Sequence, residues 1–259
     1  MADKRAEPYW IPYVSRRKFD NSEGVNESHT IKTRAIGKGN QGNFSYLIAN
    51  EWISASIANF LGLPVPPFGL MRLNDPRTAM FASVSFETRI PTEHSEPTIL
   101  WKKHPELCTG ILAFDILVGN CDRHTGNIKV NSKANPTRVH LFDHDRTLFY
   151  VYPGKGIKRL HDLADRIGVS EGSVSHGNRH CLIDVINSAD HFRFWLDRID
   201  AMPRTFTETI CWKVWGTGTT KAEIEAVVNF LDDRRRRLDE LIFTHKAEFT
   251  GIKTWPLVL

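Results

Sequence analysis

Three polar side chains in the middle of the chain have the types and the spacing that phosphoryl transfer needs. Asp122 and Asn127 stand five residues apart in a polar stretch that follows an apolar run over residues 111–118, and Asp143 follows a second apolar run. Residues 128–142 predict a β-hairpin, which would bring Asn127 close to Asp143. The oxygens of these two side chains suit Mg²⁺, a hard cation that proteins bind through oxygen ligands. Asp122 would then be free to orient a hydroxyl group and accept its proton.

The order of these residues resembles the catalytic core of HipA-like kinases and of phosphoinositide kinases. Residues 122–127 (DRHTGN) and 141–143 (LFD) match the pattern D-R-H-x-x-N followed by [IF]-D of those families. Both have the protein-kinase-like fold, in which ordinary protein kinases carry H-R-D-x-x-x-x-N and D-F-G. Here His144 and Asp145 replace the phenylalanine and glycine of D-F-G, so we expect no activation switch built on that phenylalanine. The alternative is a polar surface loop with chance acids, because Asp and Asn are common in turns.

Three further residues near this motif have expected roles. Asp145 is a candidate ligand for a second metal ion, and His124 is expected to shape the catalytic loop by hydrogen bonding and is a candidate proton relay. His144 lies between two candidate metal ligands, but a zinc centre would need more histidines or cysteines at close spacing. The sequence therefore indicates magnesium rather than zinc.

The N-terminal third of the chain resembles the small lobe of HipA-like kinases, in which a K…NE…LGLPVP pattern recurs. The matching residues are Lys32, Asn50 with Glu51, and residues 61–66. Kinases use a strand lysine that holds the ATP phosphates and pairs with a helix glutamate. The resemblance implies these roles for Lys32 and Glu51, with Glu51 on an amphipathic helix predicted over residues 44–61. A solvated helix acid is the alternative for Glu51.

Two turn-rich stretches of this third could contact phosphate. In the loop over residues 20–28, Ser22 and Gly24 could donate to ATP phosphates, although two acids argue against close phosphate contact by the whole loop. The alternative is a plain hairpin turn. Residues 36–42 (IGKGNQG) contain a literal G-x-G-x-x-G. The strand before it is polar and no acid follows at the required distance, so a dinucleotide-binding site is not indicated. We interpret this second stretch as a flexible connector.

The connection between the two halves of the chain is expected to meet the adenine ring. Residues 68–73 and 78–82 are predicted as the last strands of the N-terminal lobe, and residues 83–87 as the hinge. Backbone amides there, around Ala82 and Ser83, are expected to contact adenine.

The C-terminal part is predicted to be mostly helical. Helices are expected over residues 182–200, 205–216 and 222–243, and Thr220 with Glu223 forms a capping box for the last of them. A run of four arginines at residues 234–237 is interpreted as a solvated helix face paired with neighbouring acids rather than as a nucleic-acid site, because consecutive helix residues point in different directions.

Bulk properties agree with this interpretation. The 259 residues are 41% hydrophobic and 25% charged, which is typical of a soluble globular protein. The net charge of +4 suits a polyphosphate ligand or an acidic partner and is too small to indicate nucleic-acid binding. The four cysteines lack C-x-x-C spacing, and we see neither a signal peptide nor an apolar run of 18 residues, so we expect a cytoplasmic protein without a membrane span.

Together these observations predict an α+β, bilobal protein-kinase-like fold. Residues 1–82 would form a small β-rich lobe, residues 83–87 the hinge, and residues 88–259 a larger helical lobe, with ATP between the lobes. The resemblance implies ATP- and Mg²⁺-dependent phosphorylation of a protein serine or threonine, and such kinases often act as toxins beside a separate DNA-binding antitoxin. The alternatives are a lipid or small-molecule kinase, and a nucleotide-binding regulatory module without turnover.

Overall fold

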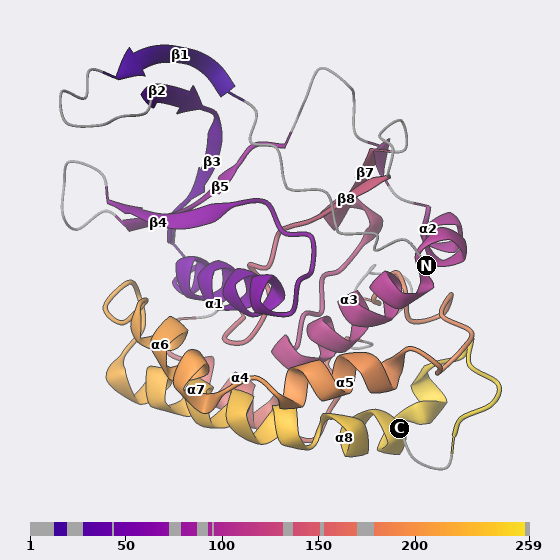
Figure 1. Cartoon of the computed structure of the whole chain (residues 1–259). Coiled ribbons are helices and arrows are strands. Elements are labelled where there is room, and N and C mark those ends of the chain that lie inside the picture. The colour runs from indigo at the N-terminus through magenta and orange to yellow at the C-terminus, as the bar shows by residue number, and fades with distance from the viewer. Residues whose placement is uncertain are drawn as a thin grey trace.

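The computed structural model describes residues 13–19, 28–42, 44–72, 79–86, 93–94, 96–131, 137–150, 153–169 and 179–256. The N-terminal part consists of small antiparallel sheets and one helix, and the C-terminal part is mostly helical (Figure 1). None of the helices in the described part of the chain combines the length and the apolar character that a membrane crossing requires.

The N-terminal part is built on a three-stranded sheet that packs on α1. The strand order is β3-β5-β4, and β1 and β2 form a separate hairpin above it (Figure 1). The element bounds are β1 Tyr13–Phe19, β2 Ser28–Thr33, β3 Ala35–Lys38, α1 Leu47–Phe60, β4 Phe68–Arg72 and β5 Ala79–Val84. The predicted helix and the last two predicted strands are therefore present.

The helix α1 is enclosed between this sheet and the C-terminal helices. It ends before Gly62, whose φ of 76° lies in the left-handed region that favours glycine. On its inner side the Trp52 indole N–H donates to the carbonyl of Ile210 in α6, at 2.9 Å. The helix is thus fixed to both parts of the molecule.

The C-terminal part surrounds a buried helix, α3, and carries a second small sheet of order β6-β7-β8. In Figure 1 α3 runs beside α1, below β7 and β8 and above the layer formed by α5, α7 and α8. The bounds are β6 Glu93–His94, α2 Pro97–Lys103, α3 Pro105–Val118, β7 Ile128–Asn131, β8 Arg138–Leu141, α4 Gly156–Leu163, α5 Phe192–Asp200, α6 Arg204–Trp212, α7 Lys221–Arg236 and α8 Leu238–Thr244, with short 3₁₀ turns η1 at Thr125–Asn127 and η3 at Lys246–Glu248.

Two helix predictions needed correction. Only the second half of residues 182–200 is helical, since turns occupy the stretch before α5. The helix predicted over residues 222–243 is divided into α7 and α8 at Arg237, which leaves the helical conformation at φ −111°. The capping box at its start is confirmed, because Thr220 and Glu223 each accept a hydrogen bond from the other's backbone N–H.

The arginine run is only partly a solvated face. Three of its members form surface ion pairs, as predicted, but Arg234 is 2% exposed. Its guanidinium donates to the carbonyls of Ile116 (3.0 Å), Leu163 (2.6 Å) and Arg166 (2.6 Å). These carbonyls stand at the C-terminal ends of α3 and α4, where a helix leaves carbonyl groups without intrahelical partners. Arg234 therefore joins three helix regions.

Candidate active site

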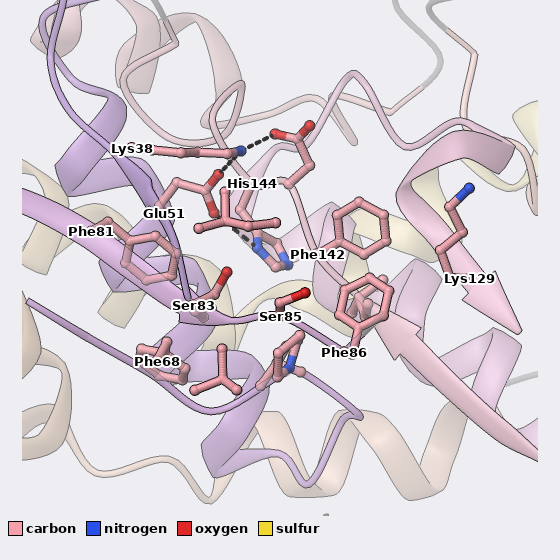
Figure 2. A pocket seen from close by; sticks show the side chains of 17 residues that line it. Lys38, Glu51, Phe68, Phe81, Ser83, Ser85, Phe86, Lys129, Phe142 and His144 are labelled. Atoms are coloured by element: carbon pink, nitrogen blue, oxygen red, sulfur yellow. Dashed lines mark hydrogen bonds and ion pairs between the residues drawn. The ribbon is translucent and has the colours of Figure 1, made fainter. Parts of the chain in front are cut away.

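A cavity of about 440 Å³ lies where the N-terminal sheet, α1 and the β7–β8 hairpin meet. Figure 2 shows Lys38 reaching into it, with Phe68 and Phe81 on one side and Phe86 and Phe142 on the other. Its lining residues are Ile36, Lys38, Glu51, Ala55, Val65, Pro66, Phe68, Phe81, Ser83, Val84, Ser85, Phe86, Lys129, Leu141, Phe142, Asp143 and His144. A largely apolar cavity with a few convergent charged groups is the usual form of a small-molecule site.

An ion-pair cluster stands inside this cavity. The ammonium of Lys38, at the end of β3, donates to the carboxylates of Glu51 and Asp143, the latter at 2.7 Å (Figure 2). Although burial alone would lower it, the pKa of Lys38 is raised by the charges of Glu51 and Asp143. The lysine is therefore a fixed cation, and it connects the N-terminal sheet to the strand end that carries Asp143.

The lysine predicted to pair with Glu51 was Lys32, whereas the structure pairs Glu51 with Lys38. Lys32 is exposed on β2, opposite Ser15 in the separate hairpin, whereas β3 pairs with β5 in the sheet that packs on α1. The lysine that reaches Glu51 is Lys38, which ends β3 in the sheet that packs on α1. Residues 35–38 (AIGK) also resemble the V-A-I-K of the corresponding protein-kinase strand, a signal that sequence reasoning missed. The same residues show that the stretch 36–42 is not a flexible connector at its start.

A histidine supports Glu51 from the opposite side. Glu51 is 2% exposed, and the Nδ1 atom of His144 lies 3.5 Å from its Oε2 atom. Burial opposes the charge of Glu51, but the His144 hydrogen bond and the Lys38 charge lower the pKa of Glu51 to about 2. The His144 ring packs edge-on against Phe114 of α3, at 5.7 Å between ring centres. His144 thus takes an aromatic position between α1 and α3, and adds a polar contact to Glu51.

The loop after α3 is anchored by a buried network that sequence reasoning did not identify. Arg123 is 1% exposed, and its Nε atom donates to Asp115 Oδ2 at 2.8 Å. The Nε2 atom of His180 lies 2.9 Å from the same oxygen. Arg123 Nη1 also donates to the Phe142 carbonyl at 2.6 Å, which ties the loop to the end of β8. The available signal was Asp115 itself, an acid inside an apolar run, because a buried acid needs buried partners.

Replacing Arg123 with methionine is expected to lower the free energy of unfolding by about 3–5 kcal/mol, because the Asp115 carboxylate would lose its cation while still buried. The measurement is chemical denaturation of the variant beside the unchanged chain. Arg193→Met is the matched control, since its ion pair with Asp197 is exposed at the surface and contributes little. A loss for Arg123→Met no larger than that of the control would contradict the anchoring role.

The predicted hairpin is confirmed, and it brings Asn127 beside the end of β8. The register pairs Ile128 with Leu141, and the Phe142 N–H donates to the Asn127 carbonyl at 3.4 Å. The Asn127 side-chain amide donates to the Asp122 carbonyl at 3.0 Å, so its side-chain oxygen remains available as an acceptor. Asn127 therefore stands between the backbones that carry the two acids of the motif.

Asp143 itself has an uncommon backbone conformation. Its φ is 63°, in the left-handed region that few residues other than glycine occupy. Such conformations cost energy and persist where the surroundings enforce them, often at functional sites. Here the conformation turns the carboxylate toward Lys38.

The segment that follows Asp143 is held against α1. The Asn50 side-chain amide donates to the carbonyls of Asp145 (2.7 Å) and Tyr150 (2.9 Å), and its oxygen accepts from the Phe149 N–H at 3.2 Å. Burial and the neighbouring charge of Asp143 raise the pKa of Asp145 to about 6. The asparagine of the N-E pair is thus a clamp for this segment, a role that the sequence pattern did not indicate.

Asp122 and His124 are the accessible side chains of the loop that follows α3. The Asp122 side chain is 26% exposed, and its Oδ2 atom lies 3.5 Å from the Nε atom of Arg146. His124 is exposed, and its Nδ1 atom accepts from the Gly126 N–H at 3.0 Å. The predicted loop-shaping hydrogen bond is therefore present, and it places the proton of a neutral imidazole on Nε2. The proton-relay role of His124 stays a prediction.

The hinge prediction is only partly matched. Ser83 lines the cavity, whereas Ala82, the next residue along β5, is not among the lining residues. The amides of Val84 and Ser85 already donate within the sheet, to the carbonyls of Pro67 (2.7 Å) and Arg34 (2.8 Å). They are therefore unavailable to adenine. The predicted phosphate-binding residues Ser22 and Gly24, together with Glu87, lie outside the described residues.

The aromatic wall at this end of the cavity comes from Phe86. Its ring stacks on His140 at 4.5 Å between ring centres and an interplanar angle of 11°, and it also contacts Phe142 at 5.2 Å. Burial, with a smaller effect of Arg138, lowers the pKa of His140 to about 4. This neutral stacked group offers an apolar surface of the kind that a purine ring favours.

The charges around the cluster fit a divalent cation. The carboxylates of Glu51, Asp122, Asp143 and Asp145 gather here, and the cations that act on them are Lys38, Arg146 and, through its charge on Asp143, the buried Arg123. Oxygen ligands from Asn127 and Asp143 match the preference of Mg²⁺ for one or two carboxylates completed by substrate phosphates. In the described part of the chain no group of three or more His, Cys, Asp or Glu forms a metal site by itself. The donor set therefore suits a metal ion that is bound together with phosphates.

The fold is similar to that of a solved kinase. The crystal structure of a Helicobacter pylori proinflammatory kinase, CtkA, superposes with a TM-score of 0.57, covering 90% of this chain and 94% of that chain at 13% sequence identity. No family profile and no curated protein sequence matches this chain. The chain therefore has a protein-kinase-like α+β fold, and its resemblance to HipA-like kinases in particular rests on the sequence motifs.

Proposed function

We propose that this chain is an ATP- and Mg²⁺-dependent kinase that transfers the γ-phosphoryl group of ATP to a serine or threonine hydroxyl of a protein. The carrying observation is the Lys38 ammonium, which Glu51 and Asp143 hold inside an apolar cavity. The loop bearing Asp122 and Asn127 adjoins this cavity through the β7–β8 hairpin. The similarity to a solved kinase supports the same conclusion.

Each charged residue has a defined task in this proposal. Lys38 binds the α- and β-phosphates, and Glu51 keeps its ammonium directed into the cavity. Asn127 and Asp143 hold Mg²⁺, with Asp145 as a further ligand. When bound, the metal ion neutralises charge on the phosphate oxygens. Asp122 orients the acceptor hydroxyl and takes its proton as the oxygen attacks phosphorus.

The nucleotide base belongs at the opposite end of the cavity. The aromatic rings of Phe68, Phe81, Phe86 and Phe142 provide an apolar slot for adenine. Polar contacts to the base would come from the chain after Ser85, since the two preceding amides are used in the sheet. In this arrangement residues 1–82 act as the smaller lobe, 83–87 as the hinge and 88–259 as the larger lobe.

The acceptor and the partner are inferred from the sequence motifs. The D-R-H-x-x-N motif and the K…NE…LGLPVP pattern favour a HipA-like serine/threonine kinase, whose partners would be a protein substrate and a separate DNA-binding antitoxin. The D-R-H-x-x-N motif, residues 122–127, is shared with phosphoinositide kinases, so the acceptor has to be identified by experiment.

The proposed activity is tested by incubating the purified chain with γ-labelled ATP and Mg²⁺, with and without a lysate of the source cells. Label in a protein band, lost with an Asp122→Asn variant, is the expected result, and mass spectrometry of that band identifies the acceptor residue. If label were found only in a small molecule or a lipid, the acceptor would be that molecule and not a protein. Bound ATP without any transfer would indicate a regulatory module.

A further inference from the structure

A second cation stands at the candidate site, next to the proposed catalytic base. The Nε atom of Arg146 lies 3.5 Å from the Asp122 Oδ2 atom. Both side chains are accessible, with 38% of Arg146 and 26% of Asp122 exposed. A distance of 3.5 Å is too long for a strong hydrogen bond, and the accessible guanidinium retains donors for another ligand.

The backbone that carries Arg146 is fixed in place. The Cys121 thiol, next to Asp122, lies 3.7 Å from the Arg146 carbonyl, as donor to acceptor. On either side of Arg146, Asn50 binds the Asp145 carbonyl and Ser54 lies 2.8 Å from the Thr147 hydroxyl. Arg146 is thus presented to the catalytic loop by a segment that α1 holds. A side chain on such a segment is preorganised, as transition-state stabilisation requires.

Each of the two cations of the site contacts one of the two carboxylates to which the proposed function gives a role. Lys38 contacts Asp143, on the proposed metal and nucleotide side, and Arg146 contacts Asp122, on the proposed acceptor side. Although burial opposes it, the pKa of Arg146 is raised by Asp122, then Tyr150 and Asp145, so its charge is permanent. A phosphoryl group that moves from the nucleotide to the acceptor passes from the first carboxylate toward the second.

We infer that Arg146 is a further catalytic residue, whose guanidinium donates to an equatorial oxygen of the transferring phosphoryl group while it contacts Asp122. In the step, the acceptor oxygen forms a bond to the γ-phosphorus, the bond from that phosphorus to the β,γ-bridging oxygen breaks, and ADP leaves with the electron pair. The hydroxyl proton goes to Asp122, and Arg146 gains and loses nothing. The inference rests on the proposed kinase function, and it adds a source of charge stabilisation that a kinase site uses where negative charge spreads over the phosphoryl oxygens.

The test compares ground-state and transition-state ligands in Arg146→Met and Arg146→Lys. Calorimetry gives the affinity for a non-hydrolysable ATP analogue with Mg²⁺ and for ADP with Mg²⁺ and aluminium fluoride, which imitates the transferring group. We expect Arg146→Met to keep the first Kd within about threefold, and to lower kcat and the affinity for the aluminium fluoride complex by about 10²–10³-fold, as for loss of one preorganised donor. Arg146→Lys should recover part of both. Lys158→Met, which removes an exposed cation on the nearby α4, should leave all three values unchanged.

The inference requires that Arg146→Met lose more affinity for the aluminium fluoride complex than for the ATP analogue. Equal affinity of Arg146→Met and the unchanged chain for the aluminium fluoride complex would overturn the inference while the kinase function stands. If Arg146→Met lost affinity for both ligands by the same factor, and Arg146→Lys recovered neither, the inference would also be overturned and Arg146 would have a structural role. Failure of the unchanged chain to bind either nucleotide would instead remove the proposed function itself.

Discussion

Replacing Asp122 with asparagine is expected to stop phosphoryl transfer while ATP binding changes little. Asparagine keeps the backbone carbonyl that accepts from Asn127, so the loop geometry should persist. It cannot accept the proton of the acceptor hydroxyl, and general-base catalysis contributes about 10²–10⁴-fold to a rate. The measurements are kcat for label transfer and Kd for ATP with Mg²⁺, and kcat should fall by that factor.

A control variant makes the Asp122 prediction specific. Asp165→Asn, which changes an acid that is 81% exposed and distant from the catalytic loop in sequence, should transfer label at the original rate. If Asp122→Asn transferred label at the rate of the Asp165 variant, another residue would have to be the base.

Replacing Lys38 with methionine is expected to reduce phosphoryl transfer by at least about 10²-fold, because a fixed charge on the phosphates is lost. The matched control is Lys32→Met, on the neighbouring hairpin, which should keep nearly full activity because Lys32 is exposed and Glu51 is paired with Lys38. Lys38→Met should also lower the free energy of unfolding by about 3–5 kcal/mol, since buried Glu51 loses its cation.

A double variant separates the two effects of Lys38. Lys38→Met combined with Glu51→Gln removes the unpaired buried charge, so it should recover much of the stability and none of the activity. Thermal unfolding and label transfer are measured on the same preparations. An active Lys38→Met, or an inactive Lys32→Met, would return the phosphate-binding role to the hairpin.

The central part of the fold was predictable because its signals are local. The helix α3 is a continuous apolar run that ends at a glycine, and the hairpin after it is delimited by a turn, so Asn127 and Asp143 could be placed together. The α1 helix was equally clear from its helical spacing. These elements carry most of the motif, which is why the candidate site could be approached from sequence.

The features that the sequence did not predict are contacts between residues far apart in the chain. Lys38 and Asp143 are 105 positions apart. Which of the two short strands β2 and β3 joins the sheet on α1 depends on tertiary packing that propensity does not encode. His180 reaches Asp115 across 65 positions for the same reason. Buried polar networks of this kind position the site. In the sequence this network is indicated only by Asp115, an acid within an apolar helix.

Calorimetric titration of ATP in the presence and absence of Mg²⁺, on the unchanged chain and on Asp143→Asn, tests the proposed nucleotide and metal site. We expect one bound ATP per chain with Mg²⁺, weaker binding without Mg²⁺, and loss of the Mg²⁺ dependence in the variant, because Asp143 is a proposed metal ligand. Unchanged Mg²⁺ dependence in Asp143→Asn would contradict the metal assignment. No ATP binding by the unchanged chain would contradict the kinase account as a whole.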